Sequence, residues 1–340
     1  MLNSSGNFSS CQPQSFNTAI AISLSIILFI GFVLNCISLW IFWFKVKQWN
    51  SMVVLQFSLA ISDALLTPVV PLLITYYLTD HWIFGLFFCQ LTVFLLSTHM
   101  YGSIYFLTLI SIHRYFTIAH SVKRKTLTRK PFITKLCLVV WGCLLCQGLP
   151  FFFALKTSKV HGVAKCLSFH QGDLGILYFV WNWVIFFSGF LIPFSITLVC
   201  YSLLIRYILK ANPMNSLSKV MLSRSVLTIF VSLIIFIVCY VPSHVFRTMA
   251  VTALLLSPNK CSVLESAEVG YNFSRLLVGI NCCLDPILYC FASKRFQRSF
   301  TSCCTLWGQH DIRAEAPLNI HHSSPLPATS TTETGLSGPT

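Results

Sequence analysis

Long apolar stretches alternate with short polar segments along this chain. Six of these stretches contain no Asp, Glu, Lys or Arg apart from Asp63, and a seventh is interrupted only by Asp285. They cover residues 16–44, 51–79, 81–113, 136–155, 174–205, 225–246 and 276–293. A membrane-spanning helix needs about 20 apolar residues, which the last stretch reaches when it is extended back toward Val269. The pattern therefore predicts seven spans.

The continuity of these stretches indicates what kind of span they form. Because hydrocarbon offers the backbone no hydrogen-bonding partner, a span is either a helix or a strand of a closed barrel. Barrel strands alternate apolar and polar positions over about 10 residues, and these stretches do not. We expect an all-α membrane protein, a seven-transmembrane helix bundle with a short amphipathic eighth helix. Its parts would be an extracellular tail (residues 1–15), the membrane domain (16–301) and a disordered cytoplasmic tail (302–340) whose end is rich in Ser, Thr and Pro.

Composition and charge fit a membrane protein. Only 9% of the residues are charged and 55% are hydrophobic, whereas soluble domains carry about 25% charged residues. The net charge of +14 could indicate a nucleic-acid partner, but 17 of the 23 Lys and Arg residues lie on one face of the predicted bundle. Basic loops stay in the cytosol and attract anionic lipid. We expect a multi-pass plasma-membrane protein in contact with the bilayer, with its N-terminus outside and its C-terminus in the cytoplasm, and no nucleic acid.

Cysteines and modification motifs sort by the same topology. Nine of the 15 cysteines fall inside spans. Four fall on the outer face, where conditions are oxidising, and can pair in three ways: Cys11, Cys89, Cys166 and Cys261. Asn3 and Asn7 begin glycosylation motifs on the outer tail. Cys303 and Cys304 follow the last span on the cytosolic face and are candidates for palmitate, with unmodified thiols as the alternative.

Polar groups inside the spans carry a family resemblance. Such groups are costly in a membrane and are functional candidates by default. In chain order, and each in its own span, the sequence contains Gly31-Phe-Val-Leu-Asn35, Leu59-Ala-Ile-Ser-Asp63, His113-Arg114-Tyr115, Trp141, Pro193 with Tyr201, Cys239-Tyr240-Val241-Pro242 and Asp285-Pro286-Ile-Leu-Tyr289. Over residues 30–300 this series resembles the signatures of rhodopsin-like (class A) G-protein-coupled receptors.

The resemblance implies a receptor without enzymatic activity that acts on a heterotrimeric G protein. The implied activation switch consists of Arg114, Tyr201, Tyr240, Pro242, Asp285, Pro286 and Tyr289. Asp63, Asn35 and Asn281 resemble the polar core that is linked to an allosteric sodium ion; no other cofactor and no metal site is expected. The resemblance also implies a Cys89–Cys166 bridge, which would leave Cys11 to pair with Cys261. The Ser/Thr-rich tail suggests receptor kinases and arrestin as partners.

Three positions depart from the family's usual residues. His113 stands where an acidic residue usually precedes Arg114, Tyr240 replaces a common Trp, and Asp285 replaces Asn. The loss of the adjacent carboxylate weakens the expected inactive-state contact of Arg114. These variants indicate one branch of the family.

Basic residues near the outer ends of the sixth and seventh spans suggest the ligand. His244 and Arg247 are three residues apart and share a helix face. Together with Arg275 they resemble the purinergic nucleotide-receptor branch, which includes receptors for leukotrienes, dicarboxylates and lysophospholipids. Arg holds carboxylate and phosphate groups through paired hydrogen bonds, so we expect a small anionic extracellular ligand. The residues expected to bind it are Arg247, Arg275, His244, Ser97 and Tyr101.

Val93 limits how highly charged this ligand can be. Several relatives in that branch carry another Arg at this position, so one or two negative charges are expected more than a triphosphate, and a lipid acid would also suit the apolar surroundings. In the structural alternative the two arginines reach the membrane interface or pair with Glu265 or Glu268. Two functional alternatives stay open. One is a secondary transporter, although the chain shows no inverted repeat, and the other is a constitutively active receptor without a soluble ligand.

Overall fold

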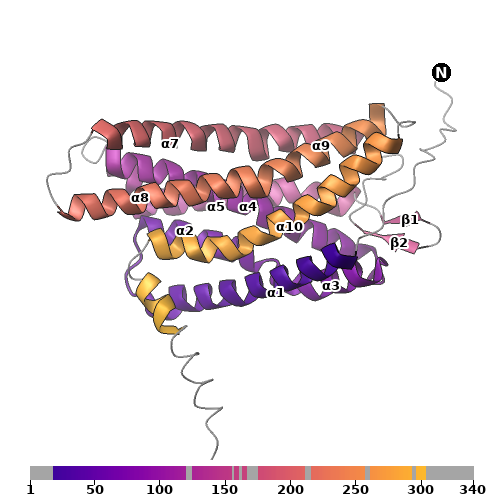
Figure 1. Cartoon of the computed structure of the whole chain (residues 1–340), viewed down its shortest axis with the longest axis horizontal. Helices are drawn as coiled ribbons and strands as arrows, with labels where there is room; N and C mark the ends of the chain where they lie inside the picture. The colour runs from indigo at the N-terminus through magenta and orange to yellow at the C-terminus, as the bar shows by residue number, and fades with distance from the viewer. Residues whose placement is uncertain are drawn as a thin grey trace, which may run out of the picture. The chain divides into compact units, whose positions relative to one another are not determined.

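The structure is a computed structural model that describes residues 18–119, 125–154, 157–160, 163–166, 175–210, 216–256, 261–292 and 296–303. Seven helices long and apolar enough to cross a membrane lie within these residues, and they run side by side in one bundle (Figure 1). The unit that ends at Phe300 contains all of them. The predicted seven-helix bundle is therefore confirmed.

Several spans consist of more than one helical segment. The first is α1 (Thr18–Trp40) with η1 (Ile41–Lys45), and the second is α2 (Ser51–Ala64), η2 (Thr67–Val69) and α3 (Val70–Thr79). The third is α4 (Gly85–Ala119); η3 (Lys125–Thr128) and then α5 (Lys130–Ala154), the fourth span, follow it. The fifth is α6 (Gly175–Ile185), η5 (Phe186–Leu191) and α7 (Ile192–Lys210), and the sixth is α8 (Ser216–Ile234), η6 (Ile235–Tyr240) and α9 (Val241–Leu256). The seventh is α10 (Cys261–Ala292), and residues 296–303 form the further helix expected after it.

Prolines explain two of the interruptions. Pro193 and Pro242 each follow a π-helical segment, η5 and η6, by two residues. Proline has no N–H to donate to the carbonyl four residues earlier, and in both spans that carbonyl lies inside the π-helical segment. A single turn of π-helix takes up such a mismatch. The predicted effect of Pro242 on the sixth span thus takes the form of a π-helical segment at a defined place.

The seventh helix starts earlier than its apolar run predicts. It begins at Cys261, whereas hydropathy places the start of the span near Val269. Glu265, Glu268 and Arg275 interrupt the apolar pattern without ending the helix, and Glu268 is only 6% exposed. Helix continuity depends on backbone hydrogen bonds, so buried charges that face other helices do not break it.

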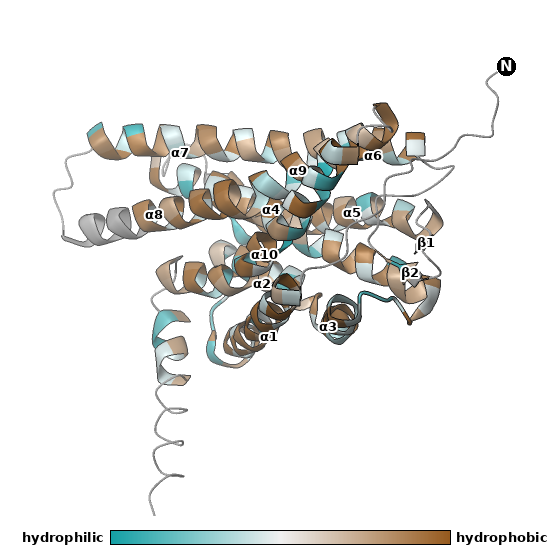
Figure 2. Cartoon of the chain, turned by 45° about the vertical axis from the view of Figure 1, so that its right-hand side comes forward, coloured by the Kyte–Doolittle hydropathy of each residue, from teal (hydrophilic) through white to brown (hydrophobic). Residues whose placement is uncertain are grey.

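The third span lies at the centre of the bundle. Helix α4 packs against α2, α5 and α7, while α10 packs against α1 and α9. Large apolar side chains point outward on the surrounding helices, and the hydropathy colouring shows hydrophobic residues along their outer surfaces (Figure 2). Because lipid tails solvate such side chains, this surface suits a bilayer.

A β-hairpin lies at one end of the bundle. Strands β1 (Ser158–Val160) and β2 (Val163–Lys165) pair antiparallel, with Lys159 opposite Ala164. The Cys89–Cys166 disulfide ties this hairpin to α4, which confirms the predicted bridge. The Trp82 N–H donates to the Ala164 carbonyl at 2.9 Å. The hairpin is therefore fixed to the bundle both covalently and through its backbone.

Candidate functional site

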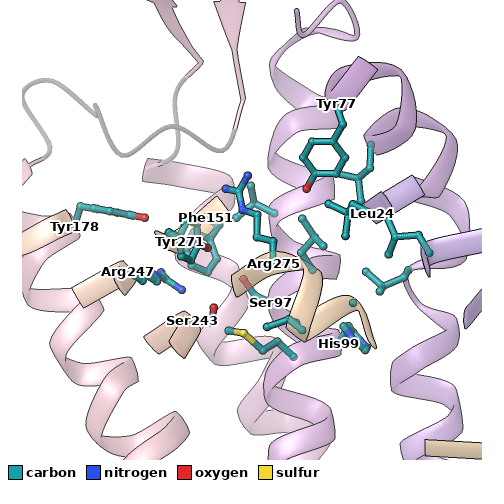
Figure 3. A pocket seen from close by; sticks show the side chains of 18 residues that line it. Leu24, Tyr77, Ser97, His99, Phe151, Tyr178, Ser243, Arg247, Tyr271 and Arg275 are labelled. Carbon is teal, nitrogen blue, oxygen red and sulfur yellow. The ribbon is translucent and has the colours of Figure 1, made fainter. Parts of the chain in front are cut away.

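A cavity of about 120 Å³ opens inside the bundle near the end that carries the hairpin. Its walls come from the first, second, third, sixth and seventh spans, together with Phe151 of α5 and Tyr178 of α6. Figure 3 shows Arg247, Tyr178 and Tyr271 toward one side of this cavity and Leu24 and Tyr77 toward the other. The apolar side chains of Leu24, Leu28, Leu66, Leu73 and Val278 complete the second side. The cavity is thus polar at one end and apolar at the other.

Arg247 is held inside the bundle by aromatic hydroxyl groups. Its side chain is only 7% exposed, and Nη1 donates a hydrogen bond to the Tyr101 hydroxyl at 3.3 Å. Tyr178 and Tyr271 lie beside the same guanidinium. Among the residues that the structure describes, no carboxylate forms an ion pair with Arg247. Neither the membrane interface nor Glu265 or Glu268 therefore accounts for this side chain.

Arg275 reaches the same cavity from α10. Its guanidinium carbon lies 4.7 Å from the centre of the Tyr271 ring, a cation–π contact. Tyr77 of α3 lies beside it as well. Figure 3 shows Arg275 between the Arg247 side and the Tyr77 side of the cavity. The structure thus brings the two predicted arginines, which come from different helices, to one cavity.

The other three predicted ligand residues take different places. Ser97 lines the cavity, and Tyr101 contributes through its bond to Arg247. His244 does not line the cavity; its ring stacks on Phe190 with centroids 4.2 Å apart and lies 5.7 Å from the Tyr101 ring. His244 therefore supports Tyr101 from behind.

Four lining residues were missed by the sequence analysis as ligand contacts: Tyr77, Tyr178, Tyr271 and His99. Tyr271 precedes Arg275 by four residues, so helical spacing alone could have paired them. Tyr77, Tyr178 and His99 come from other helices, and only the packing of the spans shows that they face the cavity. Val93 lines the cavity as well, so an aliphatic side chain stands at the position used to limit ligand charge.

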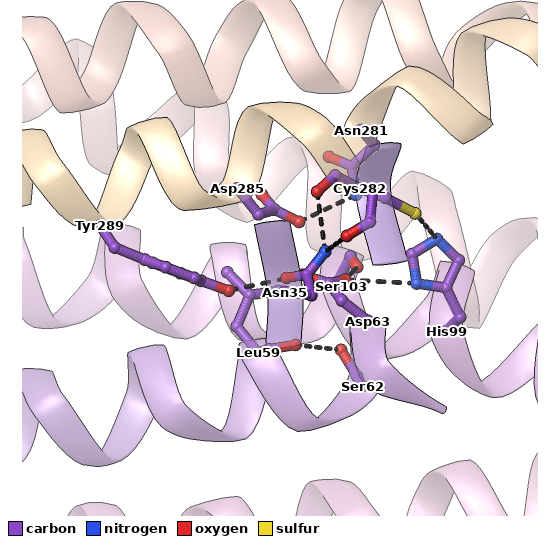
Figure 4. Close-up of polar contacts among 11 residues, drawn as sticks. Asn35, Leu59, Ser62, Asp63, His99, Ser103, Asn281, Cys282, Asp285 and Tyr289 are labelled. Atoms are coloured by element: carbon purple, nitrogen blue, oxygen red, sulfur yellow. Dashed lines mark hydrogen bonds and ion pairs between the residues drawn. The ribbon is translucent and has the colours of Figure 1, made fainter. Parts of the chain in front are cut away.

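The predicted polar core forms one connected cluster beside the cavity (Figure 4). Ser103 donates to Oδ1 of Asp63 at 3.1 Å, and Tyr289 donates to Oδ2 at 3.4 Å. Asn281 donates to Asp285 at 3.0 Å. Asn35 donates to the Cys282 carbonyl at 2.8 Å. These contacts join the first, second, third and seventh spans.

The candidate switch residues gather toward the opposite end of the bundle. The Tyr289 ring packs edge-on against Phe42 at 5.4 Å and against Phe296 at 5.6 Å. Tyr201 belongs to an apolar cluster with Leu204 and Ile229, against which the neighbour of Arg114, Tyr115, is packed.

The remaining members of the predicted switch lie within the sixth and seventh spans. Tyr240 is fully buried at the end of η6 and Pro242 follows in α9. Pro286 lies inside α10 directly after Asp285.

Some predicted sites lie partly or wholly outside the described residues. Asn3, Asn7, Cys11 and Cys304 fall there, so their glycosylation, pairing and palmitoylation stay predictions. Cys261 is disulfide-bonded, and Cys303 is a free, half-buried thiol. Within the described residues no cluster of metal-ligating side chains occurs.

Comparison with known proteins identifies what this arrangement resembles. The sequence profile of the 7 transmembrane receptor (rhodopsin family) matches residues 34–289. Purinoceptor 4 of Mus musculus is 36% identical over 293 residues, which cover 83% of this chain and 78% of that protein. Purinoceptor 2 of Homo sapiens is 34% identical, with coverage of 82% and 74%, and purinoceptor 1 of Cavia porcellus is 31% identical, with 80% and 74%.

Proposed function

Because the chain belongs to the rhodopsin family of seven-transmembrane receptors, we propose that its cavity binds a small anionic ligand. Family membership makes it a multi-pass, non-enzymatic receptor that couples an extracellular ligand to G proteins. A transporter finds no support in these matches. The ligand class is our own proposal, and it rests on the cavity.

The buried charge of Arg247 supports the proposal most directly. A buried charge is costly unless a partner of opposite charge or several hydrogen bonds compensate it. Arg247 has tyrosine hydroxyls around it and, within the described residues, no carboxylate paired to it. An anionic group placed between Arg247 and Arg275 would supply the missing charge and could accept paired hydrogen bonds from either guanidinium.

The shape and the lining of the cavity narrow the ligand further. A volume of about 120 Å³ suits a compact molecule. Leu24, Leu28 and Leu73 would face whatever part of it extends away from the arginines. Each methylene buried there contributes about 0.8 kcal/mol. We therefore favour a carboxylate or phosphate with one or two negative charges and a short apolar part, or the end of a lipid acid.

A purine nucleotide is the second candidate. The relatives that match over about four-fifths of the chain are named purinoceptors. Aromatic rings at Tyr178, Tyr271 and Phe151 line the cavity and could stack on a base. Val93 disfavours the more highly charged nucleotides, because it offers no donor to a third phosphate.

Paired ligands and paired variants test the proposal. Carboxylic acids, monophosphates and nucleotides would be screened for G-protein activation, each beside its uncharged methyl ester or amide. We expect activity from an acid and not from its neutral partner, loss of the response in Arg247→Ala and Arg275→Ala, and partial retention in Arg247→Lys. Surface expression of every variant is measured in the same cells. Full potency in both alanine variants, or equal activity of acid and ester, would end the proposal.

The orientation and the cytoplasmic partners are also proposed. The basic bias of one face supports an extracellular N-terminus, and the Ser/Thr-rich tail supports kinases and arrestin as partners. An epitope tag at the N-terminus should be detected on intact cells, and a tag at the C-terminus only after permeabilisation. Agonist should recruit arrestin to the full chain, and deletion of residues 311–340 should abolish that recruitment. Failure of either pattern contradicts the corresponding part.

A further inference from the structure

His99 lies between the ligand cavity and the polar core. It is a cavity-lining residue of α4, yet its side chain is only 1% exposed. Its Nδ1 lies 3.2 Å from Oδ1 of Asp63, and its Nε2 lies 3.4 Å from Sγ of Cys282. Figure 4 shows the imidazole ring between these two residues. The side chain thus contacts the second and seventh spans from the third.

The sequence spacing places His99 and Ser103 on the same face of α4. Residues four apart are neighbours on a helix surface, and both side chains approach the same oxygen, Oδ1 of Asp63. Tyr289 donates to the other oxygen. Both oxygens of the Asp63 carboxylate therefore have protein partners within the described residues.

These surroundings do not fit a sodium ion at Asp63. Hard cations are bound by carboxylate, carbonyl, hydroxyl and water oxygens, whereas imidazole and thiol groups suit softer metals. Here an imidazole nitrogen stands against Oδ1 of Asp63, and the thiol of Cys282 stands behind the imidazole. Oxygens of Asn35, Asn281 and Asp285 lack a donor in the described part of the chain, but ordered water can serve such groups. They do not by themselves require a metal ion.

We propose that His99 takes the place of a sodium ion at Asp63 and connects the ligand cavity to the polar core by direct contact. A ligand that displaces the imidazole would withdraw a partner from Asp63. Tyr289, which bonds the same carboxylate and packs against Phe42, would then experience the change. In this receptor the third span itself would carry the signal inward, and sodium would have no part in it.

Sodium dependence of thermal unfolding tests this without a ligand and independently of the proposed function. The purified full chain in lipid nanodiscs is unfolded in NaCl, KCl or choline chloride at equal ionic strength. We expect the same midpoint in all three salts for the wild type and for His81→Asn, a control at an exposed histidine. His99→Asn replaces the ring by a side chain with an oxygen ligand. Its midpoint should be about 2–4 °C higher in NaCl than in the other salts, and Asp63→Asn in the same chain should remove that difference.

Two results would overturn the proposal. One is a sodium-specific rise of the wild-type midpoint equal to that of the His99 variant, since His99 would then not exclude the ion. The other is a His99 variant that stays indifferent to sodium. If His99→Asn does not fold, His99→Gln replaces it under the same two criteria, and the wild-type measurement decides the first criterion on its own.

Discussion

Nη1 of Arg247 lies 3.3 Å from the hydroxyl of Tyr101, a contact that joins the sixth span to the third across one wall of the cavity. Arg247 lies in α9, directly beyond the π-helical segment η6. Tyr101 lies in α4, two residues from both His99 and Ser103. One hydrogen bond therefore links the ligand-facing charge to the helix that contacts Asp63.

Removal of the Tyr101 hydroxyl should weaken the response to an anionic agonist. In Tyr101→Phe the ring keeps its place beside His244, but Arg247 loses a partner that orients it. Hydrogen bonds to charged groups contribute about 1.5–3 kcal/mol, so we expect at least a tenfold fall in potency in a G-protein activation assay. Tyr105→Phe is the matched control, because its hydroxyl bonds Gln147 at 3.1 Å, away from the cavity. Equal loss in both variants would show a general effect on α4.

The spans and the polar core follow from sequence because they depend on local composition. Apolar runs report the hydrophobic thickness of the membrane directly, and a polar residue within such a run indicates an inward-facing site. Asp63 and Asn281 are identified in this way, and both are buried in the cluster of Figure 4. Hydropathy misplaces the start of α10 because it measures transfer into lipid, and buried charges that face other helices are exempt from that transfer.

The partners across helices do not follow from sequence. The contact of His99 with Asp63 depends on how α4 is rotated against α2, and nothing in either helix alone sets that rotation. His244 illustrates the same point. Its spacing from Arg247 places both on one face, but three residues on a helix differ by about 60° in direction. This difference is enough to put His244 against Phe190 and not in the cavity.

Close packing of α9 against α10 should make Gly270 intolerant of a side chain. A Cβ built there would lie 2.4 Å from ring atoms of Phe246, the neighbour of Arg247 in the chain. Overpacking typically costs about 1–3 kcal/mol, so Gly270→Ala should lower the thermal midpoint of the purified receptor. Gly142→Ala in α5 provides the control, since nothing lies within 4 Å of its added Cβ. There the gain in helix propensity, about 0.5–1 kcal/mol, should leave the midpoint unchanged or raise it. The opposite order of the two midpoints would contradict this packing.

The Tyr76 hydroxyl should anchor the hairpin more strongly than the nearby ion pair does. Tyr76 donates to the Cys166 carbonyl inside the protein, whereas the Asp80–Lys165 pair is partly exposed, with side chains 28% and 13% accessible. A buried carbonyl that loses its donor costs about 1–3 kcal/mol, and an exposed ion pair contributes about 0–1 kcal/mol. Thermal unfolding of Tyr76→Phe should therefore show a clear loss, and Asp80→Asn should unfold close to the wild type. A larger loss in Asp80→Asn would reverse this ranking.

Val93 offers a gain-of-function test of what limits the ligand's charge. It lines the cavity from α4, one helical turn before Ser97, which lines the cavity too. An arginine at this position would bring a third guanidinium to the cavity of Arg247 and Arg275. We expect Val93→Arg to respond to a nucleoside triphosphate at a concentration at least about tenfold lower than the wild type requires, the effect of one additional charged hydrogen bond.

The control and the stability of this variant make the result interpretable. Val93→Gln has a long polar side chain without charge, so it should leave the triphosphate response where the wild type has it. A third buried cation without a partner is costly; Val93→Arg should therefore unfold at a lower temperature than Val93→Gln, and added triphosphate should recover the difference. If the triphosphate response stays at the wild-type concentration in a variant that reaches the cell surface, then the cavity does not select its ligand by charge at this wall. The limit would then lie in its volume of about 120 Å³.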